Sequence, residues 1–177
     1  MRRVVFDSNA IDPVADTQGA YETLEAAVRA GDLDVMYTHV TIDELVAIPD
    51  LDRRATLVLL MAALGRLVPT GQMVVDFSRV NFCRVGAEED EDVVEALRSG
   101  SIDHTRDALI ASTARFECCA LVTNERRLAN RSRERGIEVL TTADLLAEFG
   151  LHPAVPEQRV EMELVGPEAS GTTVAGT

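Results

Sequence analysis

The 177-residue sequence contains no lysine and no tryptophan, so all 17 of its basic residues are arginines. Aromatic residues make up only 4% of the chain, which leaves few flat side chains on which nucleic-acid bases can stack. Because lysine is absent from the sequence, enzymes that depend on a catalytic lysine are disfavoured.

Only three cysteines are present, Cys83, Cys118 and Cys119. Their number is odd, and no pair has the Cys-x-x-Cys spacing of a structural zinc site or a redox motif. Cys118 and Cys119 lie in an apolar run, where we expect small core residues. The sequence therefore predicts neither a disulfide framework nor a structural zinc site.

Long apolar runs are also missing. The stretch 56–68 is interrupted by Gly65 and Arg66 and is too short to cross a bilayer. At the start of the chain, two arginines are followed by only three apolar residues before Asp7, which is not the pattern of a signal peptide. We expect a cytoplasmic protein that does not bind membranes.

Acidic residues dominate the charge, with 30 acidic residues against 17 basic ones and a formal net charge of −13. Indiscriminate nucleic-acid binding relies on neutralising phosphates and is disfavoured by this balance. The acidic balance does not exclude a nuclease, because divalent cations bound at an acidic site neutralise its carboxylates. A basic partner protein would also suit the chain.

We expect one domain over residues 1–150 and a C-terminal extension over 151–177, with an edge strand at 159–165 and disorder at 166–177. Apolar periodicity predicts strands at 3–6, 34–37, 118–123 and 137–140, and helices at 18–30, 41–48, 50–68, 88–97, 103–116, 125–136 and 142–149. Residues 70–88 fit short strands or a loop. This alternation predicts a three-layer α/β/α fold with a mostly parallel central sheet.

Acidic residues recur just beyond the predicted strands or in the helices that these strands join. The four that stand out are Asp7, Glu44, Asp107 and Glu125. Ligands of open α/β sheets bind beyond the carboxyl ends of the strands, so these side chains are expected to converge there. Clustered carboxylates suit Mg²⁺ or Mn²⁺ and would repel one another without a cation.

Each acid also has a purely structural explanation. Asp7 precedes Ser-Asn and fits a turn or helix cap. Thr41 and Glu44 have the spacing of a capping box. Asp107 and Glu125 fit acids near helix N-termini, which favour negative charge. Each signal is weak alone, and their joint placement favours a metal site.

Three segments resemble the motifs of PIN-domain ribonucleases: "VVFDSNAI", "THVTIDELVAI" and "RDALIASTARFECCALVTNERRL". The resemblance spans residues 3–148 and rests on the order and spacing of the motifs together. It implies a PIN-like domain that cleaves RNA with Mg²⁺ or Mn²⁺ held by Asp7, Glu44, Asp107 and Glu125. At Glu125 the chain departs from the family, which usually has Asp.

The resemblance also implies supporting roles for neighbouring residues. Side chains expected to support the metal ligands are those of Ser8, Asn9, Asp103, Thr123 and Asn124. Asp103 is included because it lies one helical turn before Asp107.

Arginines follow the last motif closely. Arg126 and Arg127 are expected to contact the RNA phosphates because they lie nearest the proposed site. We assign most members of the arginine set that follows this motif to a solvated helix face; the set is Arg126, Arg127, Arg131, Arg133 and Arg135.

Small bacterial members of this family are often toxins paired with an antitoxin protein, and helix 50–68 would line a groove for such a partner or simply join the core. A homodimer stays open as well. The alternatives are a free-standing RNA-processing nuclease and a non-catalytic PIN-like binding module. A phosphatase of the haloacid-dehalogenase type is disfavoured by Asn9, which stands where that class needs Asp, and by the missing lysine.

Overall fold

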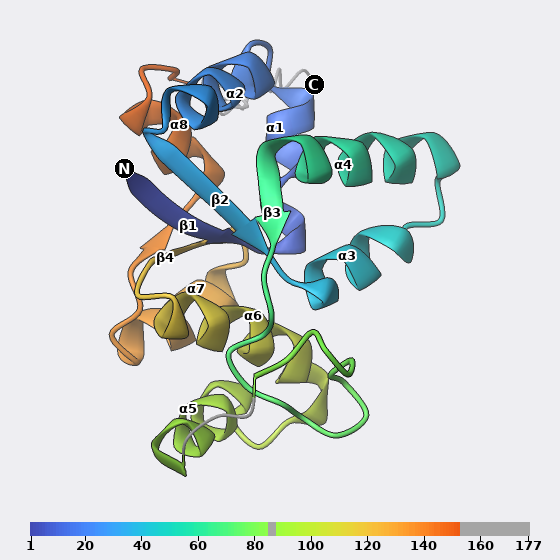
Figure 1. Ribbon diagram of the computed structural model, residues 1–177, viewed down its shortest axis with the longest axis vertical. Coiled ribbons are helices and arrows are strands. Elements are labelled where there is room, and N and C mark those ends of the chain that lie inside the picture. The colour runs from blue at the N-terminus through green and yellow to red at the C-terminus, as the bar shows by residue number, and fades with distance from the viewer. Residues whose placement is uncertain (85–87, 153–177) are drawn as a thin grey trace, which may run out of the picture.

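The computed structural model describes residues 1–84 and 88–152, with side chains described outside 88–92. A five-stranded parallel sheet lies between two layers of helices, which confirms the predicted three-layer α/β/α fold (Figure 1). The predicted edge strand at 159–165 and the predicted disorder at 166–177 fall outside the described residues.

The strands are β1 (Arg2–Phe6), β2 (Leu33–Tyr37), β3 (Gly65–Leu67), β4 (Ala120–Val122) and β5 (Val139–Leu140). Their order in the sheet is β3-β2-β1-β4-β5. From the central strand β1, the chain adds β2 and β3 on one side of the sheet. It then crosses back and adds β4 and β5 on the other side. The sheet reverses its order of construction between β1 and β4.

The α-helices are α1 (Asp12–Asp16), α2 (Ala20–Ala30), α3 (His39–Val46), α4 (Leu51–Leu64), α5 (Glu88–Arg98), α6 (Thr105–Phe116), α7 (Arg126–Glu134) and α8 (Thr142–Glu148). Short 3-10 helices η1 (Ser8–Ala10) and η2 (Ile102–His104) precede α1 and α6. Among the described helices, none has the length and apolar content that crossing a bilayer requires.

Side chains of β1 alternate between the two layers. Val4 and Phe6 pack with α1, α2, α4 and α8, whereas Val5 packs with α5, α6 and α7. All three side chains are fully buried. Burial on both faces explains why this strand reads as a continuous apolar run rather than an alternating one.

The predicted helix 50–68 is wrong at its C-terminal end. Helix α4 stops at Leu64, and Gly65 begins the edge strand β3. A Cβ atom at Gly65 would lie 3.0 Å from the backbone oxygen of Val35 in β2. Glycine thus permits the close approach that starts β3, a tertiary contact that the apolar periodicity does not reveal.

Helix α3 begins earlier than predicted, and its cap differs. Thr38 is the N-cap, and its side chain pairs with Thr41 in a capping box. The Thr41 hydroxyl also donates to the Phe6 carbonyl at 3.2 Å. The predicted pairing of Thr41 with Glu44 is therefore wrong, and the Glu44 carboxylate is left for contacts outside the helix.

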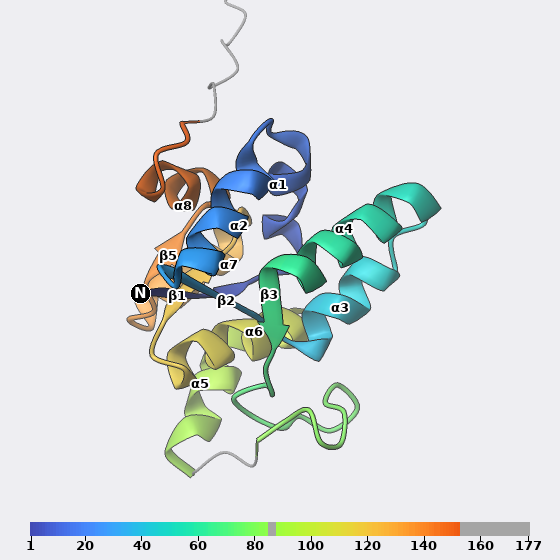
Figure 2. The same ribbon diagram turned by 45° about the horizontal axis from the view of Figure 1, so that its top comes forward.

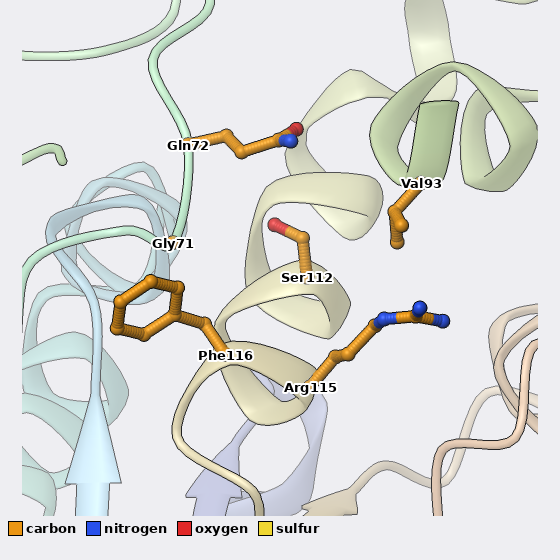
Figure 3. A pocket seen from close by; sticks show the side chains of 6 residues that line it. All are labelled: Gly71, Gln72, Val93, Ser112, Arg115 and Phe116. Carbon is orange, nitrogen blue, oxygen red and sulfur yellow. The ribbon is translucent and has the colours of Figure 1, made fainter. Parts of the chain in front are cut away.

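The loop from 68 to 84 packs tightly against α6. The Gly71 amide donates to the Thr113 hydroxyl at 3.0 Å, and a Cβ atom at Gly71 would meet the Ser112 carbonyl at 2.9 Å. Figure 3 shows Gln72 reaching from this loop toward the helices, beside a cavity of about 10 Å³, which is room for about one water molecule. The loop is thus anchored on α6 by its backbone, and its two ends are joined by an isolated β-bridge between Thr70 and Cys83.

Replacing Gly71 with alanine is expected to lower the free energy of unfolding by about 1–3 kcal/mol, because the added methyl group must displace the α6 backbone. Urea unfolding followed by circular dichroism measures the change. Met73→Ala is the control, since this side chain in the same loop is 56% exposed and its loss should cost less than about 0.5 kcal/mol. Equal effects of the two substitutions would contradict the close packing.

Candidate active site

The point where the sheet reverses its order lies at the carboxyl ends of β1 and β4. Phe6 pairs with Val122 in the register of these strands, so Asp7 and Thr123 leave the sheet side by side. The Asp7 amide continues the ladder by donating to the Val122 carbonyl at 3.0 Å. Ligands of open α/β sheets bind at such a reversal.

Asp7 is almost fully buried and accepts three short hydrogen bonds. Its carboxylate receives the Ser8 amide at 2.8 Å, the Asn9 side-chain amide at 2.6 Å and the Thr123 hydroxyl at 2.7 Å. The contact with Ser8 makes Asp7 the N-cap of η1. Asp7 therefore caps a short helix and also lies at the sheet edge where a ligand would bind.

Burial raises the pKa of Asp7 to about 7, and the nearby charges of Glu44 and Asp107 add to the increase. The hydrogen bonds from Thr123 and Ser8 oppose it by stabilising the ionised form. A carboxylate that is this costly to ionise gains strongly from a nearby cation.

Glu44 faces the same edge from α3. Its Oε2 accepts the Ser8 hydroxyl at 2.6 Å, so Ser8 connects the carboxylates of Asp7 and Glu44. Burial raises the pKa of Glu44, and repulsion from Asp107 adds to it, while the positive charge of Arg106 lowers it. Acidic and basic residues from α3 and α6 thus lie within electrostatic reach of one another.

Asp107, in the first turn of α6, forms an ion pair that the sequence analysis missed. The Arg131 guanidinium of α7 donates to its Oδ2 at 3.0 Å. Burial raises the pKa of Asp107, and Arg131 holds that increase back. The side chain of Arg131 is only 14% exposed, so this member of the arginine set does not lie on a solvated helix face.

Glu125 is the N-cap of α7 but makes no side-chain capping bond, so capping does not account for it. It is partly buried, and its charge contributes to the raised pKa of Glu44. Asn124 has a structural role. Its side-chain oxygen accepts the Thr142 amide at 3.1 Å, and its side-chain nitrogen donates to the Asn9 carbonyl at 3.1 Å.

The remaining predicted site residues lie at the surface. Asp103 belongs to η2, because α6 begins only at Thr105, and the argument that placed it on one helix with Asp107 does not hold. Arg126 and Arg127 are exposed and have no hydrogen-bond or ion-pair partner among the described residues. Arg106 was not predicted. The sequence feature that could have identified Arg106 as a site residue is its position directly before Asp107.

The donor set fits a hard divalent cation in its chemistry, since it consists of partly buried carboxylates that repel one another. The carboxylates of Asp7, Glu44 and Asp107 each have a raised pKa, and burial is the largest cause for each. Within residues 1–84 and 93–152, whose side chains the structure describes, no three His, Cys, Asp or Glu side chains lie close enough together to hold a metal ion.

Solved structures with a similar fold cover most of this chain, although no protein-family model and no curated protein matches it. The structure of PAE2754 from Pyrobaculum aerophilum is 18% identical, with a TM-score of 0.52 over 84% of this chain and 96% of that one. The structure of VapBC2 from Rickettsia felis, bound to a DNA fragment from their promoter, is 15% identical, with a TM-score of 0.51 over 78% and 98%. Both are PIN-domain proteins.

The chain has the PIN-domain fold. The fold expected from the sequence motifs is confirmed, and the edge of the PIN sheet between β1 and β4 is where Asp7 lies. At identities this low the comparison establishes the fold alone, so the activity is argued from the chain's own residues.

Replacing Arg131 with methionine is expected to lower the free energy of unfolding in EDTA by about 1–3 kcal/mol, because Asp107 keeps its charge and loses its hydrogen-bonded partner. Chemical unfolding at neutral pH measures the loss. Combining the change with Asp107→Asn should recover part of it, as expected for a coupled pair.

The matched control is Arg127→Met on the same helix, an exposed arginine whose loss should change stability by less than about 0.5 kcal/mol. If both methionine variants are equally stable, the Arg131 pair contributes nothing to the site.

The metal-free protein is expected to become more stable as the pH falls from 8 to 5. The pKa of Asp7 is about 7 in the folded protein against 3.8 as the ordinary value, so the folded state takes up this proton first. The gain is about 2–3 kcal/mol. Thermal unfolding in EDTA measures it, and Asp7→Asn should remove most of the pH dependence. A flat profile for the unsubstituted chain would count against a buried, ionisable Asp7.

Proposed function

We propose that this protein is a metal-dependent endoribonuclease that cleaves RNA phosphodiester bonds. The observation that carries the proposal is that Asp7, Glu44 and Asp107, from three different elements, lie within electrostatic reach of one another near the reversal point of the sheet. A group of ionisable side chains with perturbed pKa values at such a point is typical of a catalytic site.

Asp7, Glu44, Asp107 and Glu125 would hold Mg²⁺ or Mn²⁺. Bound there, the metal would supply a nucleophilic hydroxide near neutral pH and stabilise charge on the phosphodiester group. Carboxylates alone make up this ligand set, which suits oxygen-seeking cations rather than zinc.

The chain's own residues prepare the site. Thr123 and Asn9 fix the Asp7 carboxylate, and Ser8 fixes that of Glu44. Such hydrogen bonds hold ligands in one orientation and limit the motion that a bound substrate would otherwise have to suppress. Arg131 does the same for Asp107 and balances its charge.

A toxin role with an antitoxin partner is the finer form of the proposal. It is supported by the likeness in fold to VapBC2, a toxin–antitoxin complex. Helix α4 offers Leu59, which is 68% exposed, while Leu57 and Met61 of the same helix are buried. Co-purification of a small basic protein that blocks cleavage would support this role. An RNA-processing nuclease without an antitoxin is the alternative.

Replacing Asp7 or Asp107 with asparagine, or Glu44 with glutamine, is expected to lower Mn²⁺-dependent cleavage at least about 100-fold, because each change removes a charged metal ligand. Initial rates on a panel of fluorescently labelled structured and single-stranded RNAs, with Mn²⁺, Mg²⁺ or EDTA, measure the loss. Activity in EDTA would contradict the metal dependence.

Asp16→Asn is the matched control, because this exposed acid pairs with Arg53 away from the sheet edge and should leave the rate unchanged. Glu125→Asp tests the departure from the family pattern. If the unsubstituted chain is inactive and Glu125→Asp cleaves RNA, the natural protein is a non-catalytic module. If neither cleaves any RNA in the panel, the nuclease proposal fails.

A further inference from the structure

A cavity of about 220 Å³ is lined by residues that directly precede two of the proposed catalytic carboxylates in the sequence. Helix α3 contributes Val40 and Asp43 to its wall, α6 contributes Arg106, and the segment 76–79 closes it. Figures 1 and 2 show the loop after β3 running beside α6, on the side where α3 lies. The cavity therefore sits between the loop and two of the helices that carry catalytic acids.

Neighbouring residues connect the cavity to the site. Asp43 directly precedes Glu44 on α3, and Arg106 directly precedes Asp107 on α6. Successive residues of a helix point about 100° apart, so these two helices present acids toward the sheet edge and cavity residues beside it. Arg106 lines the cavity, and its positive charge also lowers the pKa of Glu44, so its guanidinium acts on the carboxylate site as well.

Arg106 differs from the other arginine of the cavity. Arg79 is already paired with Asp43. Arg106 is exposed and, among the described residues, has neither a hydrogen-bond acceptor nor an ion-pair partner. An unpaired guanidinium beside a cluster of carboxylates is well placed to bind a phosphate through two parallel hydrogen bonds.

The cavity wall is held in place before any ligand arrives. The Val74 amide donates to the Ser78 hydroxyl oxygen at 2.9 Å, which leaves the hydroxyl proton of Ser78 free to donate. His39 contacts the Phe77 carbonyl through Nε2 at 3.3 Å. Together with the anchoring of Gly71 on α6, these bonds fix the loop. A pre-formed wall lowers the entropic cost of binding.

We propose that this cavity binds one nucleotide of a single-stranded RNA, adjacent to the phosphodiester bond that the carboxylates would cleave. Arg106 holds the phosphate, and the polar groups of Asp76 and Ser78 bond to the base or ribose. The inference rests on the proposed nuclease function and adds a substrate subsite to it. At about 220 Å³, the cavity is smaller than the roughly 300–1,000 Å³ pockets of drug-sized ligands and suits a single splayed nucleotide.

The test measures binding without cleavage. Full-length protein carrying Asp7→Asn is titrated into a fluorescein-labelled ten-nucleotide oligouridylate in EDTA at low salt, followed by fluorescence anisotropy. Adding Arg106→Ala is expected to weaken binding about tenfold or more, the loss of a charge-assisted hydrogen bond. Adding Arg29→Ala, an exposed arginine of α2 paired with Glu25, changes the net charge equally and should weaken binding less than about twofold, as a screened distant charge.

A second measurement locates the nucleotide. Oligonucleotides carrying 4-thiouridine are photo-crosslinked to the Asp7→Asn protein, and the label is expected on the peptide containing residues 76–79. Equal effects of Arg106→Ala and Arg29→Ala, no binding of the oligouridylate, or labelling only elsewhere would each overturn the subsite. Because neither readout needs cleavage, a protein that binds through Arg106 yet cleaves nothing would refute the nuclease proposal and leave the subsite standing.

Discussion

The site depends on one constraint, which is that several like-charged carboxylates must be partly buried at one edge of a sheet. Each ionised group loses solvation there and repels its neighbours. Local contacts stabilise the ionised forms: Asp7 accepts three hydrogen bonds, Asp107 pairs with a guanidinium, and Glu44 accepts a hydrogen bond from a hydroxyl. These contacts offset only part of the cost of ionising the buried carboxylates, so the pKa values of Asp7, Glu44 and Asp107 stay raised. A bound divalent cation would lower this remaining cost most directly.

The pairing of β1 with β4 supports both the core and the site. The register that buries Val4, Val5 and Phe6 also brings Asp7 beside Thr123, because the ladder continues one residue past the apolar run. A shift of one residue would exchange the two faces of the strand and separate the carboxylate from its hydroxyl donor. Core packing therefore fixes the geometry of Asp7 and Thr123, and the site needs no separate scaffold.

The sequence was sufficient for the fold and for the position of Asp7 at the end of β1, because the apolar run that forms this strand ends in that carboxylate. The sequence was insufficient to predict helix caps, ion pairs and strand ends where a contact between distant residues decides between equivalent local patterns. Thr38 and Thr41 are both adequate caps, and only the Phe6 carbonyl gives Thr41 its second role. In the same way, Arg131 resembles its exposed neighbours on α7 until α6 brings Asp107 to it. Gly65 begins a strand because β2 approaches it closely.

The charge of the whole chain limits how RNA can bind. With a net charge of −13, long-range attraction of a polyanion is absent, and binding must come from short-range contacts. The proposed assignments meet this demand, since the exposed Arg106 directly precedes Asp107, the exposed Arg126 and Arg127 directly follow Glu125, and the metal would supply further positive charge. A nuclease built this way would discriminate through the few nucleotides that reach the sheet edge, because the net negative charge of the chain opposes binding of the rest of the substrate.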